Sequence, residues 1–433
     1  MPHEEGHRER QDPHARGHTA RGLAADGVAA EGVAAEGVAA DGIAAEGVAS
    51  LTARWAARLD AEHDTVFSAV GVWPLLALLA EVADGPARRE LEGVLGAPPQ
   101  DAAAAARSLL AELPAADGLN AALGLWTRRT LPLDAAWLAT LPEGCHALLS
   151  GDAGADRAAL DAWASRQTGG LIDRMPVEFD ASTLLVLASA LSLTTEWTHP
   201  FQDYDTHNPA RGPWAGAGLR MLTRRTAGID TAAVAQAPAG PVTIVRVEGR
   251  GGIDVHLLLG GPGMGPGEVI GAWTDVLTGR RGATPAEELP YGDDVAPGLA
   301  KDEFEGAFPA SRMLSLRTPP FRLTADHDLL RTPDVFGLAA ATGGGRGHFP
   351  GIGAFELSIQ SAAQAAMAEF GPVGFKAAAV TAIGMRAAAI VSRGERPTRV
   401  TATLDRPFGF AAVQRSTGLC LATGWVAKPR TRA

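Results

Sequence analysis

Apolar residues recur at helical spacing in the first part of the chain and fill short continuous runs in the later part. Leu51, Trp55 and Leu59 lie four residues apart, which predicts a helix. Residues 72–82 are almost wholly apolar, so we expect a helix that is buried on all sides. A further amphipathic helix should begin at the Gly-Pro pair near residue 85, because proline suits the first helical turn.

The later pattern predicts one more helix and many strands. Residues 156–175 repeat apolar side chains at helical spacing. Residues 183–193 form an apolar run that is typical of a strand buried on both faces. Other expected strands are 65–68, 119–127, 242–247, 253–259, 400–404, 408–413 and 419–426. Helices early and strands late favour an α+β fold.

A five-residue repeat of the GVAAE type occupies residues 22–49. A period of five fits neither the helix nor the strand, and a glycine in every unit costs a helix about 1 kcal/mol. We therefore expect residues 1–49 to be a low-complexity tail, disordered or frayed-helical, with order beginning near Ser50. The histidine pairs His3/His7 and His14/His18 have a metal-binding spacing, but no helix is expected to present them.

Composition narrows the possible functions. The net charge of −11 provides no basic stripe for phosphates, so a nucleic-acid partner is not expected. No apolar run reaches the length of a membrane span. The first residues lack the apolar core of a signal peptide, which predicts a cytoplasmic protein and leaves extracellular release open. The two cysteines, Cys145 and Cys420, are expected to be buried thiols, with pairing as the alternative.

Enzyme motifs are missing from the chain. Residues 260–267 are rich in glycine and lie between an expected strand and helix, but their spacing is not that of a dinucleotide loop, so we interpret them as a connector. No nucleophile elbow, zinc-protease or phosphate-loop motif occurs. We therefore expect no enzymatic activity, no cofactor and no bound metal.

The run from Gly374 to Ala382 has a different character. A glycine opens a series of small residues that ends at Thr381. Small side chains suit a segment that must enter a tight slot, because a packed interior penalises each added methylene. This run therefore indicates a loop that is able to become an inner strand.

Several segments, in order along the chain, resemble members of the serpin family. They are Phe67-Ser68, residues 160–172, the strand 184–201 ending in Trp197-Thr-His-Pro-Phe201, Pro319-Pro-Phe-Arg-Leu323, and residues 405–410 with 419–429. The resemblance covers residues 50–429. It implies an α+β serpin-like fold with a large central sheet, two further sheets, eight to nine helices and an exposed reactive-centre loop at 374–400.

The resemblance also implies roles for individual residues. Gly374 and Phe375 would begin the hinge of the loop, with Ala377, Ala378, Ala379 and Thr381 completing it. A second group, the shutter and breach of the central sheet, comprises Ser68, Ser189, Trp197 and Gln364. Several positions depart from the usual pattern. Pro372, Val373 and Lys376 replace acidic residues, Phe375 replaces a threonine, Ser189 an asparagine and Gln364 a histidine.

The implied activity is suicide inhibition of a serine protease, in which the cut loop inserts into the central sheet. The usual spacing from Gly374 places the scissile bond at Ala388-Ala389, which suits an elastase-like or subtilisin-like enzyme; Arg386, Arg393 or Arg396 would instead suit a trypsin-like one. The loop is longer than usual, so this register stays open. Crowding at Phe375, about 1–3 kcal/mol, supports an alternative, a non-inhibitory binding or structural protein, unless the core is shaped around this ring. The protein is expected to be a monomer.

Overall fold

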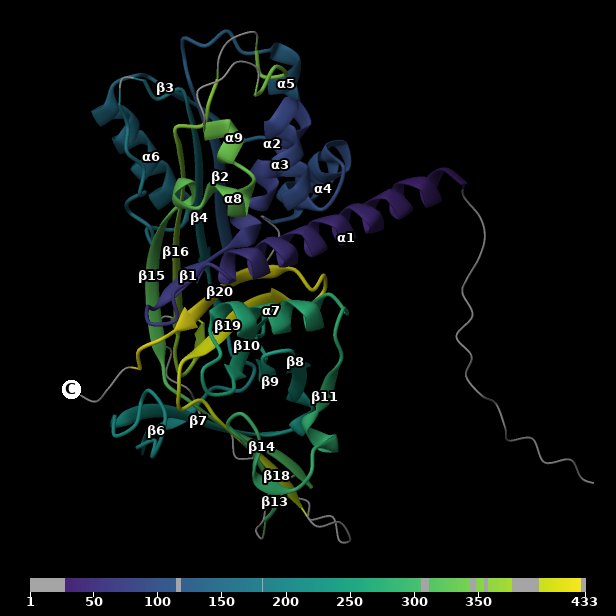
Figure 1. Ribbon diagram of the computed structural model, residues 1–433, viewed down its shortest axis with the longest axis vertical. Coiled ribbons are helices and arrows are strands. Elements are labelled where there is room, and N and C mark those ends of the chain that lie inside the picture. Colours follow the sequence, from purple (N-terminus) through teal and green to yellow (C-terminus); the bar gives the residue numbers. More distant parts are fainter. Residues whose placement is uncertain are drawn as a thin grey trace, which may run out of the picture.

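The computed structural model describes residues 28–113, 118–180, 182–304, 311–342, 348–353, 357–375 and 397–429. These residues form three β-sheets and nine α-helices, which confirms the expected α+β architecture (Figure 1). The helices are α1 (Val28–Ala56), α2 (Trp73–Val82), α3 (Gly85–Leu95), α4 (Pro99–Glu112), α5 (Ala135–Thr140), α6 (Ala153–Gln167), α7 (Pro266–Leu277), α8 (Pro333–Phe336) and α9 (Ala339–Thr342).

The central sheet has seven strands in its described part. They are β3 (His146–Leu149), β2 (Leu119–Arg128), β4 (Leu185–Leu193), β16 (Ser361–Phe370), β15 (Phe321–Asp328), β17 (Gly374–Phe375) and β5 (Thr195–Glu196). The order runs β3-β2-β4-β16-β17-β5, and β15 also pairs with β16. The β4–β16 pair is parallel, whereas β16 pairs antiparallel with β15 and β17.

Two further sheets complete the architecture. The second sheet contains, in order, β1 (Thr65–Phe67), β20 (Cys420–Val426), β19 (Phe408–Gln414), β10 (Ile253–Gly260), β9 (Gly240–Val247), β8 (Ala232–Ala237) and β11 (Ala283–Pro285). The third sheet contains β12 (Gly292–Ala296), β13 (Leu299–Glu303), β18 (Thr398–Thr403), β14 (Arg312–Thr318), β7 (Leu219–Ala227) and β6 (Gln202–His207). The third sheet lies at the lower end of the molecule in Figure 1.

Strand β4 is buried on both faces, as its apolar run predicts, because helices cover both sides of the central sheet. On one face its leucines join the main core, which also contains most of α2. On the other face Val186, Ala188 and Ala190 join a smaller cluster with Leu160 and Ala164 of α6. Small side chains on this second face let α6 pack close to the sheet.

The structure corrects two expected helix boundaries. Helix α6 ends at Gln167, not near residue 175, because Gly169 and Gly170 adopt positive φ angles that end the helix. The helix expected from Leu51 starts earlier, since α1 begins at Val28 and the last repeat unit is buried. Ala44 and Val48 continue the helical spacing of Leu51 and Trp55, so the repeat joins the core face there.

The repeat glycines of α1 occupy two different environments, which gives a matched test. A Cβ atom on Gly47 would lie 2.3 Å from Nε1 of the buried Trp73, whereas a Cβ on Gly42 meets no atom within 4 Å. Gly47→Ala should therefore destabilise the protein by about 1–3 kcal/mol through overpacking. Gly42→Ala should stabilise it by about 0.5–1 kcal/mol through helix propensity.

Thermal unfolding of the two single variants beside the unchanged protein checks this prediction. Stabilisation by both alanines would contradict the close packing of α1 on Trp73.

Both cysteines are buried free thiols, as expected. Burial raises the pKa of Cys420 to about 12, so its thiolate is suppressed. No helix in the described ranges is long and apolar enough to cross a membrane.

Candidate functional site at the opening of the central sheet

The central sheet is closed along the contact between β4 and β16. Six register pairs join the two strands, from Ser361 opposite Val186 to Ala366 opposite Leu191. Alanine occupies most of the β16 positions in this contact, and none of its residues is exposed. A further strand could enter here only if these parallel pairs separate.

A buried hydrogen-bond network crosses this contact at Gln364 and Ser189, which face each other in the register. The Gln364 side chain accepts a hydrogen bond from the Ser68 backbone N–H at 2.7 Å, and it donates to the Ser68 carbonyl at 2.8 Å. It also donates to Ser189 Oγ at 3.2 Å. The glutamine amide thus satisfies both main-chain groups of Ser68, which suits a side chain with one acceptor and two donors.

Ser68 continues this network toward the second sheet. Its hydroxyl donates to the Leu421 carbonyl at 2.7 Å, and its Oγ also caps the short 3₁₀ turn at Gly71. A Cβ on Gly71 would lie 2.3 Å from Ser189 Oγ, so a larger residue there would displace the network. The structure therefore brings together three predicted site residues, Ser68, Ser189 and Gln364, from distant parts of the sequence.

The chain leaves β16 through a tight turn and returns as the two-residue strand β17. Phe375 pairs with Phe370 of β16 on one side and with Thr195 of β5 on the other. The residues of the turn are held by the neighbouring segment 197–201. The Trp197 N–H donates to the Val373 carbonyl at 3.0 Å, and the Trp197 indole donates to the Gly371 carbonyl at 2.9 Å.

Phe375 is fully buried, and its ring lies 6.0 Å from that of Phe410. Around it, the rings of Phe321, Phe370 and Phe410 pack on one another. The space for this side chain is therefore part of the aromatic core. The ring is therefore accommodated inside the described structure.

A buried arginine strengthens the segment beside β17. Arg224 of β7 lies over the Phe201 ring, 4.9 Å from its centroid, and donates to the His199 carbonyl at 3.0 Å. Burial lowers the pKa of Arg224 to about 10, and the charge of Glu248 opposes this change. The guanidinium stays charged at neutral pH, and it ties the third sheet to the entrance of the central sheet.

Sequence reasoning missed His327, which faces Gln364 from the neighbouring strand β15. Its Nε2 lies 2.9 Å from the Val66 carbonyl, and burial lowers the pKa of its imidazole. Its surroundings in the sequence, Ala-Asp-His-Asp, are polar and predict an exposed strand end. No sequence signal identifies this histidine.

The remaining predicted site residues lie outside the described part of the chain. They are the hinge residues Ala377, Ala378, Ala379 and Thr381, the proposed scissile pair Ala388-Ala389, and the alternatives Arg386, Arg393 and Arg396. The described part of the expected loop therefore consists of its two ends, Gly374–Phe375 and residues 397–400.

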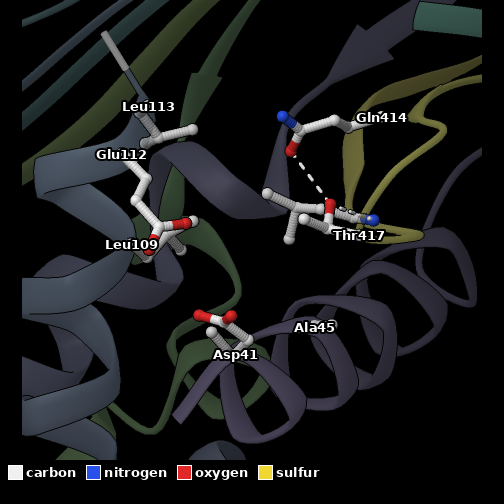
Figure 2. A pocket seen from close by; sticks show the side chains of 9 residues that line it. Asp41, Ala45, Leu109, Glu112, Leu113, Gln414 and Thr417 are labelled. Carbon is white, nitrogen blue, oxygen red and sulfur yellow. Dashed lines mark hydrogen bonds between the residues drawn. The ribbon is translucent and has the colours of Figure 1, made fainter. Parts of the chain in front are cut away.

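A small pocket lies between α1, α4 and the β19–β20 turn (Figure 2). The carboxylates of Asp41 and Glu112 extend toward it from the two helices, and Gln414 and Thr417 line the side of the turn. Its volume of about 30 Å³ holds a water molecule and is far below that of a small-molecule site.

A larger cleft of about 1190 Å³ lies beside the third sheet. Its lining includes acidic residues, such as Asp293 and Asp294, and basic ones, such as Arg211 and Lys428, so it favours no single ligand charge. Within the described ranges, no group of three or more potential metal ligands is present.

Comparisons with protein families, curated proteins and solved structures all find similarity to serpins. Residues 47–210 match the family model of serpins, the serine protease inhibitors. A serpin-10 of Oryza sativa subsp. japonica, named as non-inhibitory, is 31% identical over 167 residues. This match spans 36% of the present chain and 43% of the rice protein, so it compares less than half of either.

Solved structures extend the likeness over the whole fold. Thyroxine-binding globulin in complex with thyroxine has a TM-score of 0.64 at 18% identity, covering 90% of this chain and 99% of its own. Tengpin, a thermophilic serpin in its native state, has a TM-score of 0.67 at 15% identity, with coverages of 88% and 93%. Native protease nexin-1 with heparin has a TM-score of 0.67 at 15% identity, with coverages of 91% and 100%.

The three sheets, with a contact of small residues between β4 and β16 in the central one, define a class of protein with the serpin fold. Residues 47–210 of the chain match the serpin family model, and the fold as a whole is similar to that of solved serpins.

Proposed function

We propose that this protein inhibits a serine protease as a suicide substrate. The protease serine Oγ attacks the carbonyl carbon of the scissile residue, which we place at Ala388. The amide bond to Ala389 breaks, its nitrogen takes up a proton, and an ester joins the protease to the new carboxyl end. The segment that follows Phe375 then enters the central sheet before water hydrolyses that ester.

The observation that carries this proposal is the position of β17. Gly374 and Phe375 already pair with β5 and β16, so the first residues of an additional strand are in place. The segment that would follow is rich in alanine, and it would meet the alanine-rich contact of β4 and β16. Insertion would therefore lengthen β17, a strand that is already paired, and would not have to start a new strand.

The energetics favour insertion once the loop is cut. The inserted strand would replace one parallel ladder with two antiparallel ones, and parallel pairing is the less stable of the two per residue. About ten added backbone hydrogen bonds, at roughly 0.5–1.5 kcal/mol each, supply on the order of 10 kcal/mol. The uncut state then persists for kinetic reasons.

A second candidate is a non-inhibitory serpin that is cleaved without trapping the protease. Two observations favour it: the anchored entrance Pro372–Phe375, whose carbonyls are held by Trp197 and Phe201, and the name of the rice relative. In this case the loop or the fold would serve binding, and cutting would give no inserted strand.

Incubation with pancreatic elastase, subtilisin and trypsin separates the two candidates. We expect a covalent complex with one of these enzymes that survives SDS, and cut protein that unfolds tens of degrees higher than the uncut form. Ala379→Glu should abolish the complex while cleavage continues, because alternation along an extended β17 puts residue 379 on the core side with Phe375, where a buried unpaired carboxylate opposes insertion. Ala379→Gly is the matched control.

Clean cleavage by all three enzymes, with no complex and no gain in unfolding temperature, would favour the non-inhibitory candidate. Mass spectrometry of the cut products locates the scissile bond and decides between Ala388-Ala389 and the arginine alternatives.

A further inference from the structure

The larger cleft, beside the third sheet, is lined by segments from distant parts of the chain. Its lining includes Ala300 of β13 and Thr401 and Thr403 of β18, which are half-buried. The glycine-rich connector 261–265 also lines it, and so do residues 427–429, which follow β20. Its volume of about 1190 Å³ exceeds the usual range of small-molecule pockets, about 300–1,000 Å³. The cleft is therefore large enough to receive a segment of peptide.

Two carboxylates of the cleft have no partner among the described residues. Asp293 and Asp294 are exposed, and neither forms an ion pair or a side-chain hydrogen bond within the described ranges. Arg406, by contrast, donates from Nε to Asp405 Oδ1 at 2.9 Å, so these two charges offset each other. The lining carries further charges of both signs, on Glu62 and Arg211. A cationic segment in the cleft would therefore be attracted most strongly to Asp293 and Asp294.

An irregularity in β12 presents these two carboxylates. The register of β12 and β13 shifts between Gly292 and Ala296, so that residues 293–295 are opposite the single residue Ala300. A bulge of this kind bends its strand and re-aims its side chains, and it makes the strand edge unsuited to pairing with another strand. The free edge of the third sheet at β12 is therefore shaped to offer side chains to a ligand, and not to add a strand.

The chain itself carries a basic segment at the wall of the cleft. Lys428 and Pro429 line the cleft, and the sequence continues as Arg430-Thr-Arg432-Ala433. The three basic residues stand at every second position. Proline and the residue before it favour extended backbone, in which alternate side chains point to the same side. An extended continuation would thus place both arginines on the side of Lys428.

The start of this segment is fixed by hydrogen bonds at the cleft wall. The N–H groups of Ala427 and Lys428 both donate to Asp64 Oδ1, at 2.7 and 3.0 Å. The indole of Trp214, which also lines the cleft, donates to the Ala427 carbonyl at 2.8 Å. These contacts hold the end of β20 against the cleft, so the residues that follow Pro429 set out from its wall.

We propose that residues 430–433 dock in this cleft as a basic strap, with Arg430 and Arg432 paired to the carboxylates of Asp293 and Asp294. The strap joins the end of β20 in the second sheet to the β12–β13 hairpin in the third sheet, and it closes the cleft to other ligands. Exposed ion pairs are individually weak and are screened by salt, so the strap is held by both pairs together and is released at high ionic strength. This inference is independent of the proposed function.

A nitroxide spin label tests where the segment lies. Both native cysteines are buried free thiols, so Thr431→Cys provides an accessible thiol for the label. Alternation places residue 431 on the side away from the two arginines, so the label does not compete with the proposed pairs. The electron paramagnetic resonance spectrum of the labelled protein should contain a slow component. The same label at Thr19→Cys, in the N-terminal segment, should lack it.

Substitutions in the cleft decide whether its carboxylates hold the segment. Asp293→Asn with Asp294→Asn should reduce the slow component at least threefold, and about 1 M NaCl should do the same in the protein with the unchanged cleft. Asp173→Asn with Glu178→Gln is the matched control, since it removes two exposed acidic charges that do not line the cleft and should leave the slow component unchanged.

An exchange of charges separates a direct contact from a general effect of net charge. Arg430→Asp with Arg432→Asp should release the label, and the further changes Asp293→Arg and Asp294→Arg should restore the slow component. A label that stays mobile in this exchanged variant would overturn the strap. A slow component that survives Asp293→Asn with Asp294→Asn would overturn it too, because the segment would then be held elsewhere. A fully mobile label in the protein with the unchanged cleft would show that residues 430–433 leave the cleft open, which also refutes the strap.

Discussion

Replacing Phe375 with alanine is expected to lower the apparent free energy of unfolding of the uncut protein by about 3–5 kcal/mol. The side chain is fully buried and belongs to the aromatic core around Phe370 and Phe410, so its loss leaves a cavity that the strands cannot close. Denaturation in urea, followed by tryptophan fluorescence, measures the change.

The choice of replacement sharpens this test. Phe375→Leu keeps most of the volume and should cost less than half as much, whereas Leu148→Ala, at a side chain that is 47% exposed, should be nearly neutral. Phe375→Thr brings in the residue that serpins usually have there, yet it should also destabilise the uncut protein. Unchanged stability in Phe375→Thr would mean that the ring contributes nothing to the native core.

Phe375 also illustrates what the sequence can and cannot predict about the site. Its position in the hinge follows from the Gly374 motif, but the space around it depends on aromatic residues more than thirty positions away, such as Phe410. Tertiary packing decides whether a ring is crowded or accommodated, and a single sequence does not encode that locally. Of the two possibilities that the sequence leaves open, a crowded ring or a core shaped around it, the described structure has the second.

Strong local patterns, by contrast, were sufficient to predict the main helices and strands. The apolar run of β4 is long and uninterrupted, so its burial on both faces was predictable. Three site residues, Ser68, Ser189 and Gln364, were found through family motifs, and the structure brings them into one network. The motifs identify the positions, but the hydrogen bonds between them needed the structure.

Elements with weak patterns were missed. Strands β12 and β13 are five residues each and carry acidic and small residues, so neither alternation nor apolar content marks them. Strand β17 has two residues, below any useful window. The start of helix α1 was also misplaced, because the helical state of an Ala-rich repeat with frequent glycines depends on packing against Trp73 and its neighbours.

A second large loss of stability is expected when Gln364 is replaced. Gln364→Leu should lower the apparent free energy of unfolding by about 1–3 kcal/mol, since the buried Ser68 N–H is left without a partner, whereas the Ser68 carbonyl still accepts from the Gly71 N–H. The exposed Gln202→Leu on β6 is the matched control and should be nearly neutral.

Gln364→His distinguishes loss of hydrogen bonding from loss of volume. A neutral imidazole offers one acceptor and one donor, so it can replace part of the network and should be less harmful than leucine at pH 8. Below its ordinary pKa of about 6.5, a protonated ring would lose the acceptor that the Ser68 N–H requires, and the variant should lose stability as the pH falls from 8 to 5.

Because the network spans the contact where β4 and β16 must separate, the same variants should open the central sheet more readily. Amide exchange in β16 that is no faster in Gln364→Leu than in Gln202→Leu would show that other contacts keep the sheet closed.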